Sequence, residues 1–143
     1  MVTITIHKEH VKEHIQEIND AIAIGIEKRP ATLGLHASAC SISLIELYLH
    51  CLGKITSGSN IKHEWFRRPN PGQKIIPLAE RKIAMDFSNK EEIFSLMYDI
   101  EDNRNKLIYG KPTKSAIRDV LAAFQKLHTI VKEELQKRGE EIE

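Results

Sequence analysis

The chain has 143 residues, a length typical of one domain, and we expect a single domain over residues 1–143. With 41% hydrophobic and 29% charged residues, it has the composition of a globular domain, which excludes collagen-like and disordered chains. The net charge of +1 gives no overall attraction to nucleic acid or to a membrane, and no apolar run approaches the ~18 residues of a transmembrane helix. Two cysteines, Cys40 and Cys51, are too few for a disulfide framework, and the apolar segment before His7 is too short for a signal sequence. We therefore expect a reducing, cytoplasmic setting without membrane contact.

The first third of the chain predicts a short strand and two long helices. Residues 2–6 alternate Val or Ile with Thr, which is typical of a strand. From His7 onward apolar residues recur every three or four positions, as in an amphipathic helix, and Pro30 and Gly34 are expected to end it. The next helix, over residues 35–52, is apolar over most of its circumference, which indicates a central position in a bundle.

An irregular insert follows, over residues 53–87 approximately. It contains three glycines and three prolines, which favour loops and turns. Pro77 is a suitable first residue for a short helix that continues to Met85. Connections of this length between helices are often functional.

Two further helices complete the predicted fold. Ser88 with Glu91 three residues later forms a capping box at the start of the third helix, and Gly110 marks its end. The last helix is expected over residues 113–138, with a polar C-terminal end at residues 133–143. The sequence therefore predicts an all-α fold, an antiparallel bundle of four main helices with an irregular basic insert between helices 2 and 3.

One charged residue falls on the apolar face of the third helix. Arg104 lies between apolar residues at helical spacing, and a buried guanidinium must be paired or face a wet groove. Glu46, on the second helix, is the expected partner, with His50 one turn later. Two interpretations stay open: Arg104 reaches solvent or pairs within the bundle, or Glu46, His50 and Arg104 form a polar pocket or a dimer seam.

Histidines are concentrated at the start of the chain. His7, His10 and His14 share one flank of the first helix, at a spacing that suits a transition metal. Because no carboxylate is placed to join them, we favour a solvated or interfacial edge and expect no metal. Phosphate-binding, dinucleotide-binding and zinc-protease motifs are missing from the sequence, so no cofactor is expected.

The insert has a local charge that the total conceals. Residues 62–82 contain six cations and two carboxylates, a balance of +4. Cations contact phosphates and exposed aromatic rings stack on bases, a combination that suits single-stranded RNA. The candidate RNA-binding residues are Lys62, Trp65, Arg67, Arg68 and Lys74. The alternative is a basic loop whose Trp65 closes the end of the bundle.

The end of the third helix carries, at residues 103–110, the sequence NRNKLIYG. This segment resembles the motif of the HEPN family of small all-helical proteins. The family motif is an Arg, usually followed by a polar residue, and then a His after four to six residues. Arg104 and Asn105 match its first part, and Tyr109 stands where the His is expected. The apolar second helix with Glu46 and the long last helix are similar to the same family.

The resemblance implies a homodimer in which two such motifs form a metal-independent endoribonuclease site. It implies that Arg104 stabilises phosphate, supported by Asn105 and Tyr109, and that Glu46 holds Arg104. It also implies RNA as a substrate and, as in toxin–antitoxin members, a nucleotidyltransferase-type antitoxin as a partner. A phenol keeps its proton at neutral pH and is a poor general base, so Tyr109 implies weak or no cleavage.

Two other classes of protein remain open from the sequence. In the first, the chain is a non-catalytic structural or dimerisation bundle in which Arg104 pairs with Glu46 inside one subunit. In the second, it is a small-ligand or metal-binding module that uses His36, Glu46 and His50. An exposed Arg104 in a cleft favours the RNA hypothesis over both.

Overall fold

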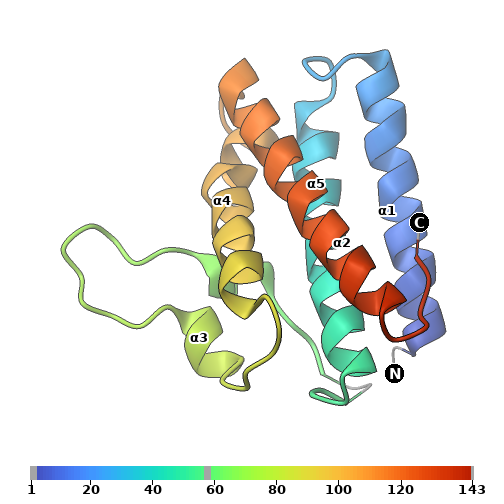
Figure 1. Cartoon of the computed structure of the whole chain (residues 1–143). Coiled ribbons are helices and arrows are strands. Elements are labelled where there is room, and N and C mark those ends of the chain that lie inside the picture. Colours follow the sequence, from blue (N-terminus) through green and yellow to red (C-terminus); the bar gives the residue numbers. More distant parts are fainter. Residues whose placement is uncertain (1–2, 57–58, 143) are drawn as a thin grey trace.

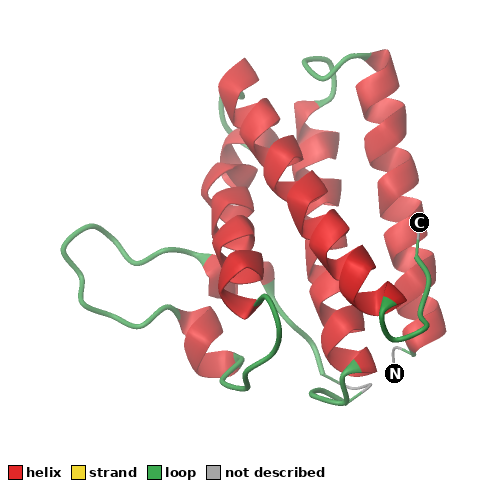
Figure 2. Cartoon of the chain, viewed as in Figure 1, coloured by secondary structure: helices red, strands yellow, loops and turns green. Residues whose placement is uncertain are grey.

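The apolar periodicity of the sequence is realised in four long helices. The structure is a computed structural model and describes residues 3–56 and 59–142. Those residues form an all-α fold without strands (Figures 1 and 2). The long helices are α1 (Ile4–Ile24), α2 (Pro30–Cys51), α4 (Lys90–Ile108) and α5 (Lys114–Gln136), and the insert adds a 3-10 turn η1 (His63–Phe66) and the short α3 (Leu78–Lys82).

The second helix is the centre of the fold, as its apolar circumference predicted. α2 packs against α1, α4, α5 and η1. Its length and composition are also those of a membrane-crossing helix, but 72% of the relevant window is buried inside the protein. This burial is typical of the core helix of a globular protein. Gly34 lies where α2 meets α4, and a Cβ there would come within 2.8 Å of the Leu107 Cβ.

The predicted strand near the N-terminus is wrong. α1 already begins at Ile4, and the Thr3 hydroxyl accepts a hydrogen bond from the Ile6 N–H at 3.2 Å. Thr3 is therefore an N-cap, and a satisfied cap outweighs a short alternation that has no partner strand. Residues 1–2 of the predicted strand lie outside the described residues.

The boundary between the first two helices also differs from the prediction. α1 ends at Gly25, whose φ of +132° favours glycine, rather than at Pro30. Pro30 begins α2 instead, because proline fits the first turn of a helix, where no backbone donor is needed. Gly34 is inside this helix, at the close approach to α4.

The start of α4 does not use the predicted capping box. Its N-cap is Asn89 in the left-handed conformation, φ +67°, and no side chain caps the helix. Ser88 has another role, because its carbonyl accepts a hydrogen bond from the buried Tyr48 hydroxyl at 3.1 Å. The end of α4 before Gly110 and the start of α5 near residue 113 are as predicted, and the Thr113 hydroxyl caps α5 by accepting a hydrogen bond from the Ala116 N–H.

The insert is fixed at both ends and projects between them. Ile61 and Phe66 are buried, and the Phe66 ring packs edge-on against Phe94 at 5.2 Å between centroids. Residues 67–77 then leave the body of the helices as a long loop, which Figure 1 shows in light green. The chain returns through α3, which begins directly after Pro77 and buries Ala79. The helix is shorter than predicted, because it ends at Lys82 and not at Met85.

Candidate functional site: a groove beside Arg104

The insert and three helices enclose a groove of about 370 Å³. Its wall is apolar where α2 contributes Leu35, Ala39 and Ile42. Its rim is polar and carries both cations and imidazoles. The polar residues at the groove are His14 from α1, Ser38 and Ser43 from α2, Lys62, His63 and Glu64 from the insert, and Arg104 from α4.

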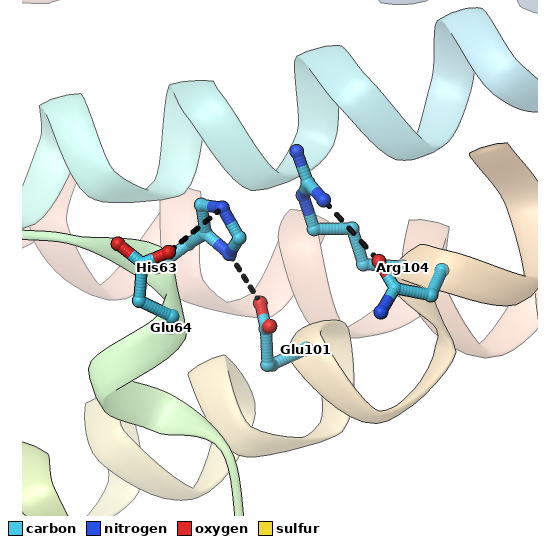
Figure 3. Close-up of polar contacts among 5 residues, drawn as sticks. His63, Glu64, Glu101 and Arg104 are labelled. Atoms are coloured by element: carbon cyan, nitrogen blue, oxygen red, sulfur yellow. Dashed lines mark hydrogen bonds and ion pairs between the residues drawn. The ribbon is translucent and has the colours of Figure 1, made fainter. Parts of the chain in front are cut away.

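Arg104 reaches this groove, and no ion pair holds it within residues 3–56 and 59–142. Its Nη1 donates one hydrogen bond, to the Asn105 Oδ1 at 3.4 Å. Its Nε is buried and has no hydrogen-bond partner among the described residues. In Figure 3 the guanidinium extends from α4 toward α2. The guanidinium thus keeps donor capacity for a ligand, since it carries five N–H donors in all.

The predicted pair of Glu46 with Arg104 does not form. Glu46 is buried, and its Oε2 accepts a hydrogen bond from the Ile61 backbone N–H at 3.2 Å. Burial raises the pKa of Glu46, while that hydrogen bond and the nearby His10 lower it. No ion pair joins Glu46 to Arg104 in the described ranges. Glu46 therefore anchors the insert on α2 and does not position the arginine.

A buried carboxylate holds the histidine of the insert. The His63 Nδ1 lies 2.9 Å from the Glu101 Oε2, and the Glu101 side chain is only 3% exposed (Figure 3). An ionised carboxylate only accepts hydrogen bonds, so Nδ1 carries a proton, and the neutral form of the ring has its lone pair on Nε2. The nearest charge to Nε2 is the Glu64 carboxylate, at 3.9 Å.

Sequence reasoning missed this pair. Glu101 stands one turn before Arg104 on the apolar face of α4, so it was as anomalous as Arg104 and could have been found. His63 had no such signal, because its position depends on how the insert folds back across α2 and α4. The pairing joins residues 38 positions apart, which no local pattern encodes.

Histidines link α1 to α2 at two points. The Nδ1 atoms of His14 and His36 are 2.9 Å apart, and the rings of His7 and His50 meet edge to face at 5.9 Å. Burial, followed by the neighbouring imidazole, lowers the pKa of both His7 and His14. His7, His10 and His14 were expected to form a solvated or interfacial edge of the first helix. His7 and His14 lie at the interface between α1 and α2, whereas His10 is exposed.

The structure does not assemble the alternative metal module. His36 pairs with His14, Glu46 binds the backbone of the insert, and the His50 ring packs on His7. Among the described residues, no group of three side chains is placed to hold a metal ion.

The predicted RNA-binding residues separate into free and engaged groups. Lys62, Arg67 and Lys74 are exposed, and Lys62 lies at the groove. Arg68 instead binds two carboxylates of α4, Asp99 at 2.9 Å and Asp102 at 3.2 Å.

The positions of Trp65 and Tyr109, the two aromatic candidate site residues, could not be predicted from the sequence alone. Trp65 is half-buried against the core, with the Lys82 Nζ 5.9 Å from its ring, as expected if it closes the end of the bundle. Tyr109 is 80% exposed at the C-cap of α4 and does not line the groove. Asn105 is exposed and contacts Arg104.

The groove therefore combines an apolar wall with two cations, the His63 imidazole and the exposed Glu64 carboxylate. Arginine binds phosphate oxygens through several N–H donors, and an apolar wall accepts a planar base. The arrangement suits an anionic ligand with an aromatic part, such as a nucleotide unit. No protein-family model, curated protein or solved structure matches this chain.

Proposed function

We propose that the protein is a HEPN-like, RNA-associated helical bundle that binds a phosphodiester backbone in the groove beside Arg104. The observation that carries this proposal is the unpaired guanidinium of Arg104, whose buried Nε has no partner among the described residues. Arg104 is half-buried and its Nε is shielded from solvent, so a bound anion would pair a donor that the described residues leave unused. In this proposal the four long helices form an antiparallel bundle.

The cations of the insert extend the proposed RNA path beyond the groove. Lys62 stands at the groove itself, and Arg67 and Lys74 are exposed on the projecting segment. Each phosphate contact adds to a binding energy that salt weakens. Arg68 and Trp65 are left out of the path, because α4 and the core engage them.

The proposal includes a homodimer and a nucleotidyltransferase-type partner, as the HEPN resemblance implies. Exposed apolar side chains support a partner surface near the groove. Leu35, which lines the groove, is 46% exposed, and Tyr109 at the end of α4 is 80% exposed. Light scattering of the purified chain tests the dimer directly.

The test of RNA binding compares the wild type with Arg104→Ala at 50 and 200 mM salt. The probe is a pool of 30-nucleotide single-stranded RNAs of random sequence. We expect Arg104→Ala to weaken binding about tenfold, since a charge-assisted hydrogen bond contributes ~1.5–3 kcal/mol. Arg118→Ala, which removes an exposed arginine of α5, is the matched control and should leave affinity unchanged.

Each outcome of that experiment has a distinct meaning. If the wild type fails to bind the pool at 50 mM salt, the RNA proposal is wrong and the structural-bundle interpretation replaces it. If both arginine variants bind as the wild type does, the groove is not the site, and the basic insert alone accounts for binding.

A further inference from the structure

We propose that His63, positioned by Glu101, is the general base of an RNA-cleaving site in the groove beside Arg104. The inference rests on the proposed function, because it assumes that the groove holds a phosphodiester. The inference goes beyond the proposed function because it assigns the proton transfer of the cleavage that the HEPN resemblance implies to a residue outside the 103–110 segment.

The first support is the tautomer that Glu101 imposes. The Glu101 Oε2 accepts the Nδ1 proton of His63 at 2.9 Å. The carboxylate side chain is only 3% exposed, whereas that of His63 is 32% exposed. In the neutral form of His63, Nδ1 therefore carries the proton on the buried side, and the lone pair is on Nε2 of an accessible ring. A carboxylate in this position also stabilises the imidazolium that forms when the base takes up a proton.

The second support is that the same helix delivers the arginine. Glu101 and Arg104 are three residues apart on α4, so they share a face of that helix. Figure 3 shows the His63 ring and the Arg104 guanidinium on the side of α4 that faces α2. Both residues line the groove. A base and an anion-binding cation therefore converge on one volume, as catalysis of phosphoryl transfer requires.

The reaction that these groups fit is transesterification of RNA. The His63 Nε2 removes the proton of a ribose 2′-hydroxyl, and the 2′-oxygen forms a bond to the adjacent phosphorus. The bond from phosphorus to the 5′-oxygen breaks, and that oxygen takes a proton from water in the open groove. The resulting hydroxide removes the proton from His63. The products are a 2′,3′-cyclic phosphate and a 5′-hydroxyl, and Arg104 offsets the charge that develops on the phosphate.

Tyr109 is not needed in this reaction. It is 80% exposed and does not line the groove, so it has no place in the proposed proton transfer. Glu64 opposes the reaction, because its carboxylate lies 3.9 Å from the His63 Nε2 and repels phosphate. Its side chain is 52% exposed and can turn away when RNA binds. Glu64→Gln should therefore strengthen RNA binding.

The decisive variant is His63→Asn. The asparagine amide is positioned to replace Nδ1–H as donor to Glu101, so the buried carboxylate stays satisfied, but Nε2 is removed. With the random RNA pool in EDTA, we expect cleavage to fall at least 100-fold while the dissociation constant of the pool is unchanged, since a general base contributes ~10²–10⁴-fold. His10→Asn, on an exposed histidine of α1, is the matched control and should cleave as the wild type does.

Glu101 is a positioning residue, and its test separates that role from a structural one. Glu101→Gln should lower kcat and leave KM unchanged, because RNA contacts the arginine and lysine and not Glu101. A loss of folding would reduce both binding and cleavage. His63→Gly should be inactive and regain activity when imidazole is added, which a structural defect would not do.

The outcomes distinguish this inference from the proposed function. Cleavage with a 2′,3′-cyclic end, lost in His63→Asn and missing on a 2′-deoxy substrate, supports it. RNA that is bound but not cut by the wild type overturns the inference and leaves the RNA-binding proposal intact. Cleavage by His63→Asn at the wild-type rate also overturns it. An RNA pool that is not bound overturns both proposals.

Discussion

His14 on α1 and His36 on α2 place their Nδ1 atoms 2.9 Å apart. A hydrogen bond at this distance needs one protonated and one unprotonated nitrogen. Two imidazolium rings at the same separation would repel each other and would have no acceptor between them. The contact between α1 and α2 is therefore built for at least one neutral histidine.

Stability is expected to fall when this pair is protonated. Burial and His36 lower the pKa of His14, so the unfolded chain binds more protons than the folded chain below the ordinary value of about 6.5. The stabilisation is present above pH 6.5 and is lost progressively as the pH falls toward the folded-state pKa. His7, whose pKa burial and His50 also lower, acts in the same direction. Urea denaturation at pH 7.5 and 5.5 measures the difference.

Two variants identify the source of that pH dependence. His14→Gln removes the titrating ring and should reduce the loss of stability between pH 7.5 and 5.5. His10→Gln, at an exposed position on the same helix, should reduce the loss less than His14→Gln does, because His10 is only the last of the causes that lower the pKa of His14. Glu46 acts in the opposite direction, because burial raises its pKa and the folded chain takes up that proton more readily. An equal loss in His14→Gln and the wild type would show that the His14–His36 contact is not responsible.

Arg68 is expected to hold the loop in place rather than bind RNA. Its guanidinium bridges Asp99 and Asp102 of α4 and lies 5.5 Å from the centre of the Tyr98 ring. These groups are substantially exposed, so Arg68→Ala should lower the free energy of unfolding by no more than ~1 kcal/mol. Limited proteolysis within residues 67–77 should nevertheless become several-fold faster.

Arg67→Ala is the matched control for Arg68, since Arg67 is exposed and has no ion pair in the described part of the chain. It should leave proteolysis unchanged and weaken RNA binding, with a smaller dependence of affinity on salt. The reverse pattern, in which Arg68→Ala alone weakens RNA binding, would contradict both assignments.

Loss of the hydroxyl group should destabilise the protein at Tyr48 and have no effect at Tyr109. The buried Tyr48 donates to the Ser88 carbonyl at 3.1 Å, so Tyr48→Phe removes a hydrogen bond and leaves that carbonyl without its donor. The expected loss of unfolding free energy is about 1 kcal/mol. Tyr109→Phe, at an 80% exposed position, should not change stability. Urea denaturation of the two variants side by side measures the contrast, and equal effects would refute it.

Gly34→Ala tests the close approach of α2 and α4. The new Cβ would come within 2.8 Å of the Cβ of Leu107, a buried residue whose Cβ moves only with the backbone of α4. Overpacking of this kind typically costs ~1–3 kcal/mol, which exceeds the ~1 kcal/mol gain in helix propensity. Ala122→Gly on the exposed side of α5 measures the propensity contribution by itself. A more stable Gly34→Ala variant would show that the helices separate without penalty.

The four long helices could be predicted because local apolar patterns determine them. Several helix ends could not be predicted, because contacts between distant residues determine them. The periodic apolar residues predicted all four long helices, and the all-round apolar α2 predicted its central position. The predicted capping box at Ser88 is wrong because α4 begins one residue later, after Asn89 in the left-handed conformation, and the Ser88 carbonyl binds Tyr48, 40 residues away. The predicted helix end at Gly34 is wrong because this glycine is needed for close packing against Leu107, which the local sequence does not reveal.

The residues of the groove were likewise predictable from local sequence patterns only in part, because some of their contacts join distant parts of the chain. Arg104 was conspicuous from its place on an apolar face, and the structure puts it at the groove. Its expected partner Glu46 was wrong, because the backbone of Ile61 takes that carboxylate. His63 and Glu101 meet only through the path of the insert, which apolar periodicity cannot specify.

The loop at residues 67–77 is attached at two separate points, which has a practical consequence. Phe66 before it and Ala79 after it are fully buried, so both ends are fixed independently of the tip. Doubling the length of such a loop costs only about 0.6 kcal/mol in closure entropy. The turn at Pro71 and Gly72, which is exposed, is therefore a suitable place to insert a fluorescent reporter. A reporter there would follow the loop during RNA binding while the groove keeps its geometry.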